Sequence, residues 1–230
     1  KFGVGKDNID LDFAKKNNIK VVTQQGTNSQ SVAELVICFS LMYCRNLYYQ
    51  INNNKNYIWK NTIGLNLSEK KFGIIGCGNV GKKIVEILKP FNCKIFVHDK
   101  INYKVFNKKH NINKVSLKKL ITNSDIISIN LPMNESTDNF INSKNLKYFK
   151  RHSCLINTSR GGIVNEKELF LYMKKYENFN AFFDVMKKEP NKNSKLTKLN
   201  NFYLSSHIGG STAESIKRMG VAAVEGIIKN

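Results

Sequence analysis

The chain has 230 residues, 41% of them hydrophobic, which is enough for a large domain or for a domain with part of another. No run of about 18 uncharged apolar residues is present, so we expect no membrane-spanning helix. The formal net charge is +20, but the basic residues are nearly all lysines, interspersed with asparagine. Because proteins that read nucleic acid rely on clustered arginine, we expect no nucleic-acid partner. The positive field would favour an anionic small molecule.

Cysteine usage and the first residues indicate the setting of the protein. The five cysteines are odd in number and show no Cys-x-x-Cys spacing, which predicts reduced, mostly buried thiols and no metal site. We therefore expect a cytoplasmic location. The start at residues 1–5 lacks an initiator Met and a signal-peptide pattern, and we expect it to be a cut edge of a longer chain.

Apolar runs of strand length alternate with amphipathic stretches, a pattern typical of a parallel α/β sheet. The predicted strands are residues 21–23, 72–75, 94–98, 126–131, 154–157, 181–183 and 202–205. The predicted helices are a long apolar one at residues 31–49, one from Gly78 to near Pro90, one from Ser116, and two that begin with capping-box patterns at Asn165 and Ser211. Residues 103–113 and 191–200 are predicted to be polar loops.

A glycine-rich motif lies between the second predicted strand and its helix. It runs over residues 76–81, and Asp99 follows at the end of the next strand. Gly76 would make the tight turn, Gly78 would let the backbone approach a pyrophosphate, and Gly81 would let the helix pack closely. Asp99 would accept hydrogen bonds from ribose hydroxyls and repel a 2′-phosphate. The motif predicts a doubly wound Rossmann domain that binds NAD.

Residues suited to chemistry or to close backbone approach follow most of the predicted strands. Ligands of open α/β sheets bind outside the carboxyl ends of the strands. We therefore expect one crevice lined by residues from distant parts of the chain, namely Gly76, Asp99, Pro132, residues 158–162, Asp184 and His207.

Within this crevice, hydride transfer to a 2-keto acid needs a cation, a general acid and a partner for that acid. Arg160 fits the cation, since guanidinium binds carboxylate bidentately. His207 stands at a strand end before Ile208-Gly209-Gly210 and is the candidate acid. Glu189 is the chosen partner that would hold the imidazole tautomer. The other acids in reach are Glu166, Glu168 and Glu214.

The chain resembles the D-isomer-specific 2-hydroxyacid dehydrogenases along nearly its whole length. The resemblance rests on motifs in family order and spacing, at residues 3–10, 28–34, 76–81 with Asp99, 159–162, 183–185 with 189–190, and 207–214. The His-Ile-Gly-Gly-Ser-Thr form of the last motif is most similar to phosphoglycerate dehydrogenases. These enzymes use NAD to oxidise 3-phosphoglycerate to 3-phosphohydroxypyruvate, the first step of phosphorylated serine biosynthesis.

The resemblance implies a catalytic set of Arg160, Glu189 and His207. It implies cofactor contacts at Val4, Gly76, Gly78, Asn79, Val80, Gly81, Asp99, Leu131, Pro132, Thr158, Ser159, Arg160, Asp184, His207, Gly209 and Gly210. Within that set, Asp184 is expected at the nicotinamide end. The substrate, a small anionic 2-hydroxy or 2-keto acid, is expected to meet Val4, Gly5, Asn28, Arg160 and His207.

The resemblance also implies a domain organisation, in which an NAD-binding domain is inserted in a smaller flavodoxin-like substrate domain. Residues 1–24 would be part of the substrate domain, residues 25–208 the NAD-binding domain, and residues 209–230 a helix that returns to the substrate domain. We expect the substrate domain to be incomplete here. The helix at residues 31–49 would join a homodimer or tetramer.

Two other functions remain open. A glyoxylate or hydroxypyruvate reductase, or another D-2-hydroxyacid dehydrogenase, would use the same catalytic set. The groups that would hold a substrate phosphate are expected in the part of the substrate domain that this chain lacks. A protein of another class, an NAD-sensing corepressor-like protein that binds without turnover, can keep the same residues.

Overall fold

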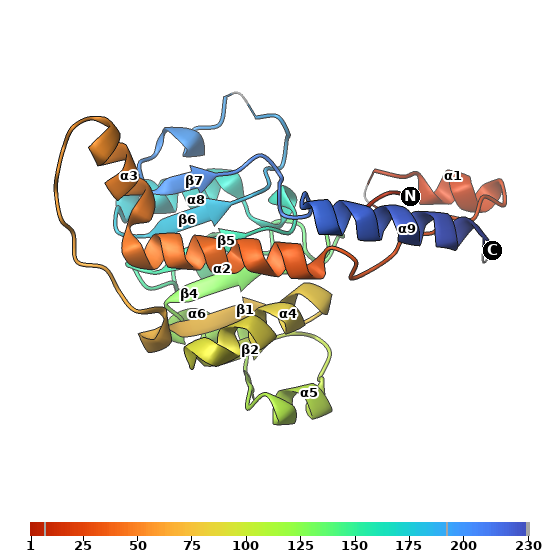
Figure 1. Ribbon diagram of the computed structural model, residues 1–230, viewed down its shortest axis with the longest axis horizontal. Helices are drawn as coiled ribbons and strands as arrows, with labels where there is room; N and C mark the ends of the chain where they lie inside the picture. Colours follow the sequence, from red (N-terminus) through yellow and green to blue (C-terminus); the bar gives the residue numbers. More distant parts are fainter. Residues whose placement is uncertain (7, 192, 229–230) are drawn as a thin grey trace.

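The computed structural model describes residues 1–6, 8–191 and 193–228. Within these residues the chain forms a seven-stranded parallel sheet in the order β3-β2-β1-β4-β5-β6-β7 (Figure 1). The order reverses between β1 and β4, as in doubly wound folds, so the predicted fold class is confirmed. The strands are β1 Lys71–Ile75, β2 Lys94–His98, β3 Asn113–Lys114, β4 Ile126–Ile129, β5 Cys154–Asn157, β6 Asn180–Phe183 and β7 Phe202–Leu204.

Helices cover both faces of this sheet. Successive strand residues point to opposite faces, so Ile74 joins one buried cluster with α2 and α4, while Ile75 joins another with α6 and α8. The helices are α1 Leu11–Lys16, α2 Ser29–Arg45, α3 Leu47–Lys55, α4 Asn79–Leu88, α5 Lys104–Lys109, α6 Leu117–Asn123, α7 Ser143–Leu146, α8 Glu166–Lys175 and α9 Ala213–Ile228. Single 3₁₀ turns lie at Leu67–Glu69, Lys89–Phe91, Gly161–Ile163 and Leu196–Lys198.

The strand predicted at residues 21–23 is wrong. This segment lies outside the sheet and packs on α9, where a Cβ on Gly226 would stand 2.7 Å from Val22 Cγ1. The backbone oxygen of Val22 accepts a hydrogen bond from the terminal ammonium of Lys1 at 2.8 Å. Val22 therefore contacts a helix rather than a neighbouring strand.

The helix predicted at residues 31–49 is also wrong, because it is two helices. Asn46 adopts a left-handed backbone with φ of 49° and separates α2 from α3. The predicted polar loop at residues 103–113 contains α5 and the start of β3. Phe106 of α5 packs on His110, with ring centroids 4.3 Å apart.

Helix starts agree more closely with the sequence patterns. Asn165 accepts a hydrogen bond from the backbone of Glu168 at 3.2 Å, but the Glu168 carboxylate accepts the Ser143 N–H at 2.5 Å, so the capping box is half formed. At α9 the cap is Thr212 rather than Ser211, since Thr212 Oγ1 accepts the Ser215 N–H at 3.1 Å.

The five thiols are free, but they are not uniformly buried. Cys44, Cys77 and Cys154 are buried, Cys93 is half-buried and Cys38 is exposed on α2. In the described part of the chain no helix is long and apolar enough to cross a membrane. Among the same residues, no group of three or more His, Cys, Asp or Glu side chains could hold a metal ion.

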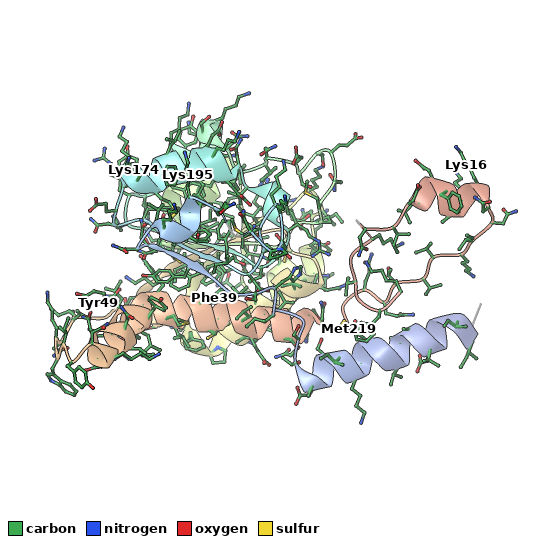
Figure 2. The ribbon with its side chains drawn as sticks, turned by 90° about the horizontal axis from the view of Figure 1, so that it is seen from above. Lys16, Phe39, Tyr49, Lys174, Lys195 and Met219 are labelled. Atoms are coloured by element: carbon green, nitrogen blue, oxygen red, sulfur yellow. The ribbon has the colours of Figure 1, made fainter. Side chains whose placement is uncertain are left out.

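The two ends of the chain lie together, apart from the helices that cover the sheet. The strand arrows in Figure 1 point toward the side on which α1, α9 and both termini lie. Figure 2 shows the same separation from above, with Lys16 of α1 and Met219 of α9 far from Tyr49 of α3. The carboxyl edge of the sheet therefore faces the unit formed by the two chain ends.

Asp125 ties together the opposite, amino edge of the sheet. Its carboxylate accepts the Lys71 N–H at 2.8 Å and pairs with Lys150 Nζ at 2.6 Å. Burial alone would raise the pKa of the Asp125 carboxyl, but the hydrogen bonds from Lys150 and Lys71 outweigh it and hold that pKa below its ordinary value.

We expect Asp125→Ala to lower the free energy of unfolding by about 1–3 kcal/mol at pH 7. A lowered folded-state pKa means that the stabilisation is complete above the unfolded value of about 3.9 and is lost as pH falls through the folded value. Urea unfolding of both proteins at pH 7 and at about pH 3 checks this. An equal difference at the two pH values would contradict the role of the ionised carboxylate.

Candidate active site

The loops after three neighbouring strands carry the candidate catalytic residues. Arg160 follows β5, Glu189 lies in the loop after β6, and His207 follows β7. These strands pair in parallel, with Asn157 opposite Phe183 and Phe183 opposite Leu204. Their carboxyl ends therefore meet at one edge of the sheet, where ligands of doubly wound folds bind.

Glu189 and His207 form the pair that the sequence predicted. His207 Nδ1 lies 2.7 Å from Glu189 Oε2, and Glu189 Oε1 accepts the Met186 N–H at 2.8 Å. A carboxylate accepts, so Nδ1 is the donor in this pair. The side chains of His207 and Glu189 are 49% and 37% exposed, which leaves the pair open on one side.

A buried carboxylate shapes the turn that carries His207. Asp184 is 1% exposed and accepts the Ile208 N–H at 2.8 Å, the Gly209 N–H at 2.7 Å and the hydroxyl of Ser205. The backbone of His207 bends through a left-handed φ of 54°. These contacts offset the cost of that conformation. The role of Asp184 at a nicotinamide stays a prediction.

The loop of Arg160 is tied to the loop of Glu189. A Cβ on Gly161 would stand 1.9 Å from the backbone carbon of Met186, so only glycine permits this backbone contact. Glu166 Oε1 accepts the Lys187 N–H at 2.6 Å. Glu166, considered above as an alternative partner for His207, therefore holds the neighbouring loop. No sequence signal distinguished this role.

The glycine-rich loop has the geometry of a phosphate cradle. Gly76 has a φ of +90°, and a Cβ on Gly81 would lie 2.3 Å from the Gly76 oxygen. At Gly78 a Cβ would meet none of the described atoms within 4 Å, so its backbone borders open space at the start of α4. Asp99 supports the loop by accepting the Cys77 N–H at 2.5 Å. The arrangement fits a dinucleotide pyrophosphate at a helix N-terminus.

A buried hydroxyl beside Arg160 also fits a bound cofactor. Thr158 is 8% exposed, and its Oγ1 has no hydrogen-bond partner among the described residues. A buried polar atom without a partner is costly, and a ligand would relieve that cost. The family resemblance implies that Thr158 lies beside the cofactor, and this oxygen fits such a contact, which stays a prediction.

Leu131 and Asn28, two of the remaining predicted residues, lie beside glycines of these loops. A Cβ on Gly76 would stand 3.1 Å from Leu131 Cδ2, and one on Gly210 would stand 3.0 Å from Asn28 Nδ2. Val4 and Gly5 precede α1, in the N-terminal segment that Figure 1 shows beside α9. Further members of the predicted set occur in the same segments, namely Asn79 and Val80 in α4, Pro132 after β4, Ser159 beside Arg160, and Gly209 in the His207 turn.

Cys77 lies inside the glycine-rich loop and is fully buried. Burial, followed by the charge of Asp99, raises the pKa of the Cys77 thiol to about 11, although Lys82 acts in the opposite direction. The thiolate that attacks electrophiles is therefore scarce at neutral pH.

We expect iodoacetamide at pH 8 to modify the exposed Cys38 well before Cys77. Peptide mass spectrometry of a time course checks this order, with the urea-unfolded chain as the control in which all five thiols react. Equal rates at Cys38 and Cys77 in the folded protein would contradict the burial and pKa given for Cys77.

Gly78 and Gly81 offer a matched pair of substitutions. We expect Gly78→Ala to leave the melting temperature nearly unchanged but to weaken NADH binding about tenfold or more, roughly 1.4 kcal/mol, because its methyl group enters the space next to the pyrophosphate. Gly81→Ala should lower both the melting temperature and the affinity for NADH, since its Cβ would lie 2.3 Å from the Gly76 oxygen. Thermal unfolding and NADH fluorescence titration check this. Unchanged NADH affinity in Gly78→Ala would contradict the cradle.

Comparison with known proteins gives a consistent result. The family described as "D-isomer specific 2-hydroxyacid dehydrogenase, NAD binding domain" matches residues 37–209. A hydroxypyruvate reductase from Thermotoga maritima is 33% identical over 232 residues, covering 99% of this chain and 75% of that protein. A D-3-phosphoglycerate dehydrogenase from Methanocaldococcus jannaschii is 31% identical over 230 residues, covering 99% of this chain but only 44% of that protein.

A solved structure supports both the fold and the cofactor. The crystal structure of D-lactate dehydrogenase from Aquifex aeolicus, complexed with NAD and lactic acid, superposes with a TM-score of 0.89 at 26% identity. The match covers 99% of this chain and 74% of that one. The family match, the relatives and the glycine-rich loop agree: the chain belongs to the NAD-dependent D-isomer-specific 2-hydroxyacid dehydrogenases.

Proposed function

We propose that the protein oxidises 3-phosphoglycerate to 3-phosphohydroxypyruvate with NAD, using Arg160, Glu189 and His207 as catalytic residues. The observation that carries the proposal is the 2.7 Å hydrogen bond between Glu189 and His207, next to the loop of Arg160. Bound NAD supplies the acceptor for the hydride that leaves C2. The residues of the chain bind the substrate and move its proton.

His207 takes the hydroxyl proton of the substrate at Nε2. Its Nδ1 already donates to Glu189, which leaves the Nε2 lone pair directed to the substrate. As the proton arrives, the O–H bonding electrons form the carbonyl double bond and the imidazolium is stabilised by the adjacent carboxylate. In the reverse reaction the same nitrogen returns the proton to the developing alkoxide.

Arg160 binds the carboxylate of the substrate. Its guanidinium offers paired N–H donors, and flanking residues Ser159 and Gly161 are small. A cation at this place also stabilises negative charge on the oxygen at C2 during hydride transfer. The net charge of +20 supports a substrate that carries a phosphate as well as a carboxylate.

Reduction of hydroxypyruvate or glyoxylate is the second candidate. The relative from T. maritima, named hydroxypyruvate reductase, is 33% identical, against 31% for the phosphoglycerate dehydrogenase from M. jannaschii. The catalytic set would act in the same way on either acid. The difference would lie in groups that meet the phosphate.

We also propose that residues 1–24 and 209–230 are parts of a second, substrate-binding domain. The two segments that would connect the domains, near residues 27–31 and 212–218, lie side by side. Ser31 Oγ lies 2.8 Å from Thr212 Oγ1, and Arg218 Nε donates to Thr27 O at 3.0 Å. Most of α9 is exposed, including Val221, Val224 and Ile227. Further chain covering this face would also shield the half-exposed pair of Glu189 and His207.

A homodimer or larger homo-oligomer through α2 and α3 is part of the proposal. Leu41, Leu47, Tyr48 and Ile51 are exposed on these two helices, and Trp59 is 92% exposed in the segment that follows. Exposed apolar side chains gathered in this way are typical of subunit interfaces.

We expect NADH oxidation by the full-length protein to be fastest with 3-phosphohydroxypyruvate when hydroxypyruvate and glyoxylate are tested at equal concentration. Arg160→Ala and His207→Ala should each lower kcat/KM by about 10²-fold or more, within the range for a lost general acid or electrostatic group. NADH affinity should persist. Absorbance at 340 nm and NADH fluorescence are the measurements.

Each other outcome has a definite meaning. A preference for an unphosphorylated acid would replace the proposed substrate by the second candidate. Unchanged kcat/KM in His207→Ala would contradict its role in proton transfer. Tight NADH binding without turnover of any acid would favour a protein that senses NAD.

A further inference from the structure

Asn157 is a buried polar side chain that the catalytic set does not include. It is the last residue of β5 and is 0% exposed. Its backbone oxygen accepts the Asp184 N–H at 2.9 Å, so its main chain is fixed by the neighbouring strand β6. Its side chain therefore projects from a rigid part of the sheet.

The Asn157 amide uses both of its ends on the loop of Arg160. Its Oδ1 accepts the Ser159 N–H at 3.1 Å and the Ser159 hydroxyl at 2.7 Å. Its Nδ2 donates to the Arg160 carbonyl oxygen at 3.0 Å. The Asn157 amide meets these partners because it carries an acceptor and a donor on two separate atoms of one planar group.

These contacts surround an oxygen atom that the guanidinium binds. Arg160 Nη1 donates to the Ser159 carbonyl oxygen at 2.8 Å. That carbonyl belongs to the peptide unit between Ser159 and Arg160, and Asn157 holds the Ser159 N–H on one side of the unit and the Arg160 carbonyl on the other. Asn157 and the Arg160 guanidinium are thus linked through this peptide.

We infer that Asn157 is a positioning residue that sets where Arg160 meets the substrate carboxylate. The inference rests on the proposed role of Arg160. Because β5 and Asp184 hold the main chain of Asn157 independently, a change confined to its side chain shifts the loop without removing the strand. A small displacement of a substrate-binding cation weakens carboxylate binding and slows turnover together.

The test replaces one atom of the amide. Asn157→Asp in the full-length protein keeps an acceptor for Ser159 but loses the donor to the Arg160 oxygen. The first measurement is the affinity for oxamate, a planar analogue of a 2-keto acid, with NADH at saturation. The others are the affinity for NADH alone, and kcat and KM with hydroxypyruvate.

We expect Asn157→Asp to weaken oxamate binding about tenfold or more, to raise KM and to lower kcat, while NADH affinity changes less than about twofold. Asn157→Ser, which leaves a shorter acceptor, should show a smaller loss in the same direction if the first variant fails to fold. Asn201→Asp is the matched control. It removes the hydrogen bond that Asn201 Nδ2 donates to the Phe179 oxygen at 2.7 Å, at the amino edge of the sheet. This change should leave oxamate binding as it is.

Two results would overturn the inference: unchanged oxamate affinity in a folded Asn157→Asp protein, or an equal loss of NADH and oxamate binding. Arg160→Ala separates this failure from failure of the proposed function. If Arg160→Ala itself leaves oxamate binding unchanged, Arg160 is not the carboxylate cation and both the function and the inference fall. If Arg160→Ala loses oxamate and Asn157→Asp does not, only the inference falls.

Discussion

Parallel pairing of β5, β6 and β7 is the constraint on which the proposed catalytic centre depends. Their partners in register bring together the carboxyl ends of segments that are far apart in the sequence. The loops that follow the three strands therefore begin at the same edge of the sheet. Arg160, Glu189 and His207 lie in these loops and so share one region. The proposed catalytic residues lie on loops, yet the sheet sets the spacing of those loops.

Buried polar side chains give these loops the rigidity that regular structure gives to strands. Asp184 holds the turn of His207 by its two backbone N–H contacts at Ile208 and Gly209. Glu166 holds the loop of Glu189, and Asn157 holds that of Arg160. Each satisfies backbone groups that have left the sheet and would otherwise lack partners. A buried carboxylate and a buried amide are thus structural necessities at this edge.

Much of this arrangement was predictable from sequence because it rests on strong local signals. Central strands such as β1 and β5 are continuous apolar runs, and the glycines at residues 76–81 show their spacing directly. The pairing of Glu189 with His207 followed from the position of each after a strand and from the resemblance to the family, although other acids were in reach.

The rest lacked a local signal. β3 consists of two exposed polar residues and gains its place by pairing at the edge of the sheet. Asn46 breaks a helix without glycine or proline nearby, through its own left-handed backbone. Residues 21–23 carry the composition of a strand, but Val22 contacts Gly226 of α9 instead of a strand. For Asn157 and Glu166, only tertiary contacts show which loop each one holds.

The contact between the two ends of the chain has a consequence for synthesis. Val22 packs against Gly226, and Phe2 lies near Gly220, so these partners are separated by almost the full length of the chain. On the ribosome, the sheet can pair strand by strand as β1 to β7 emerge, whereas residues near Val22 must wait until α9 leaves the exit tunnel. Val22 therefore lacks its α9 partner from its own synthesis until α9 has been made.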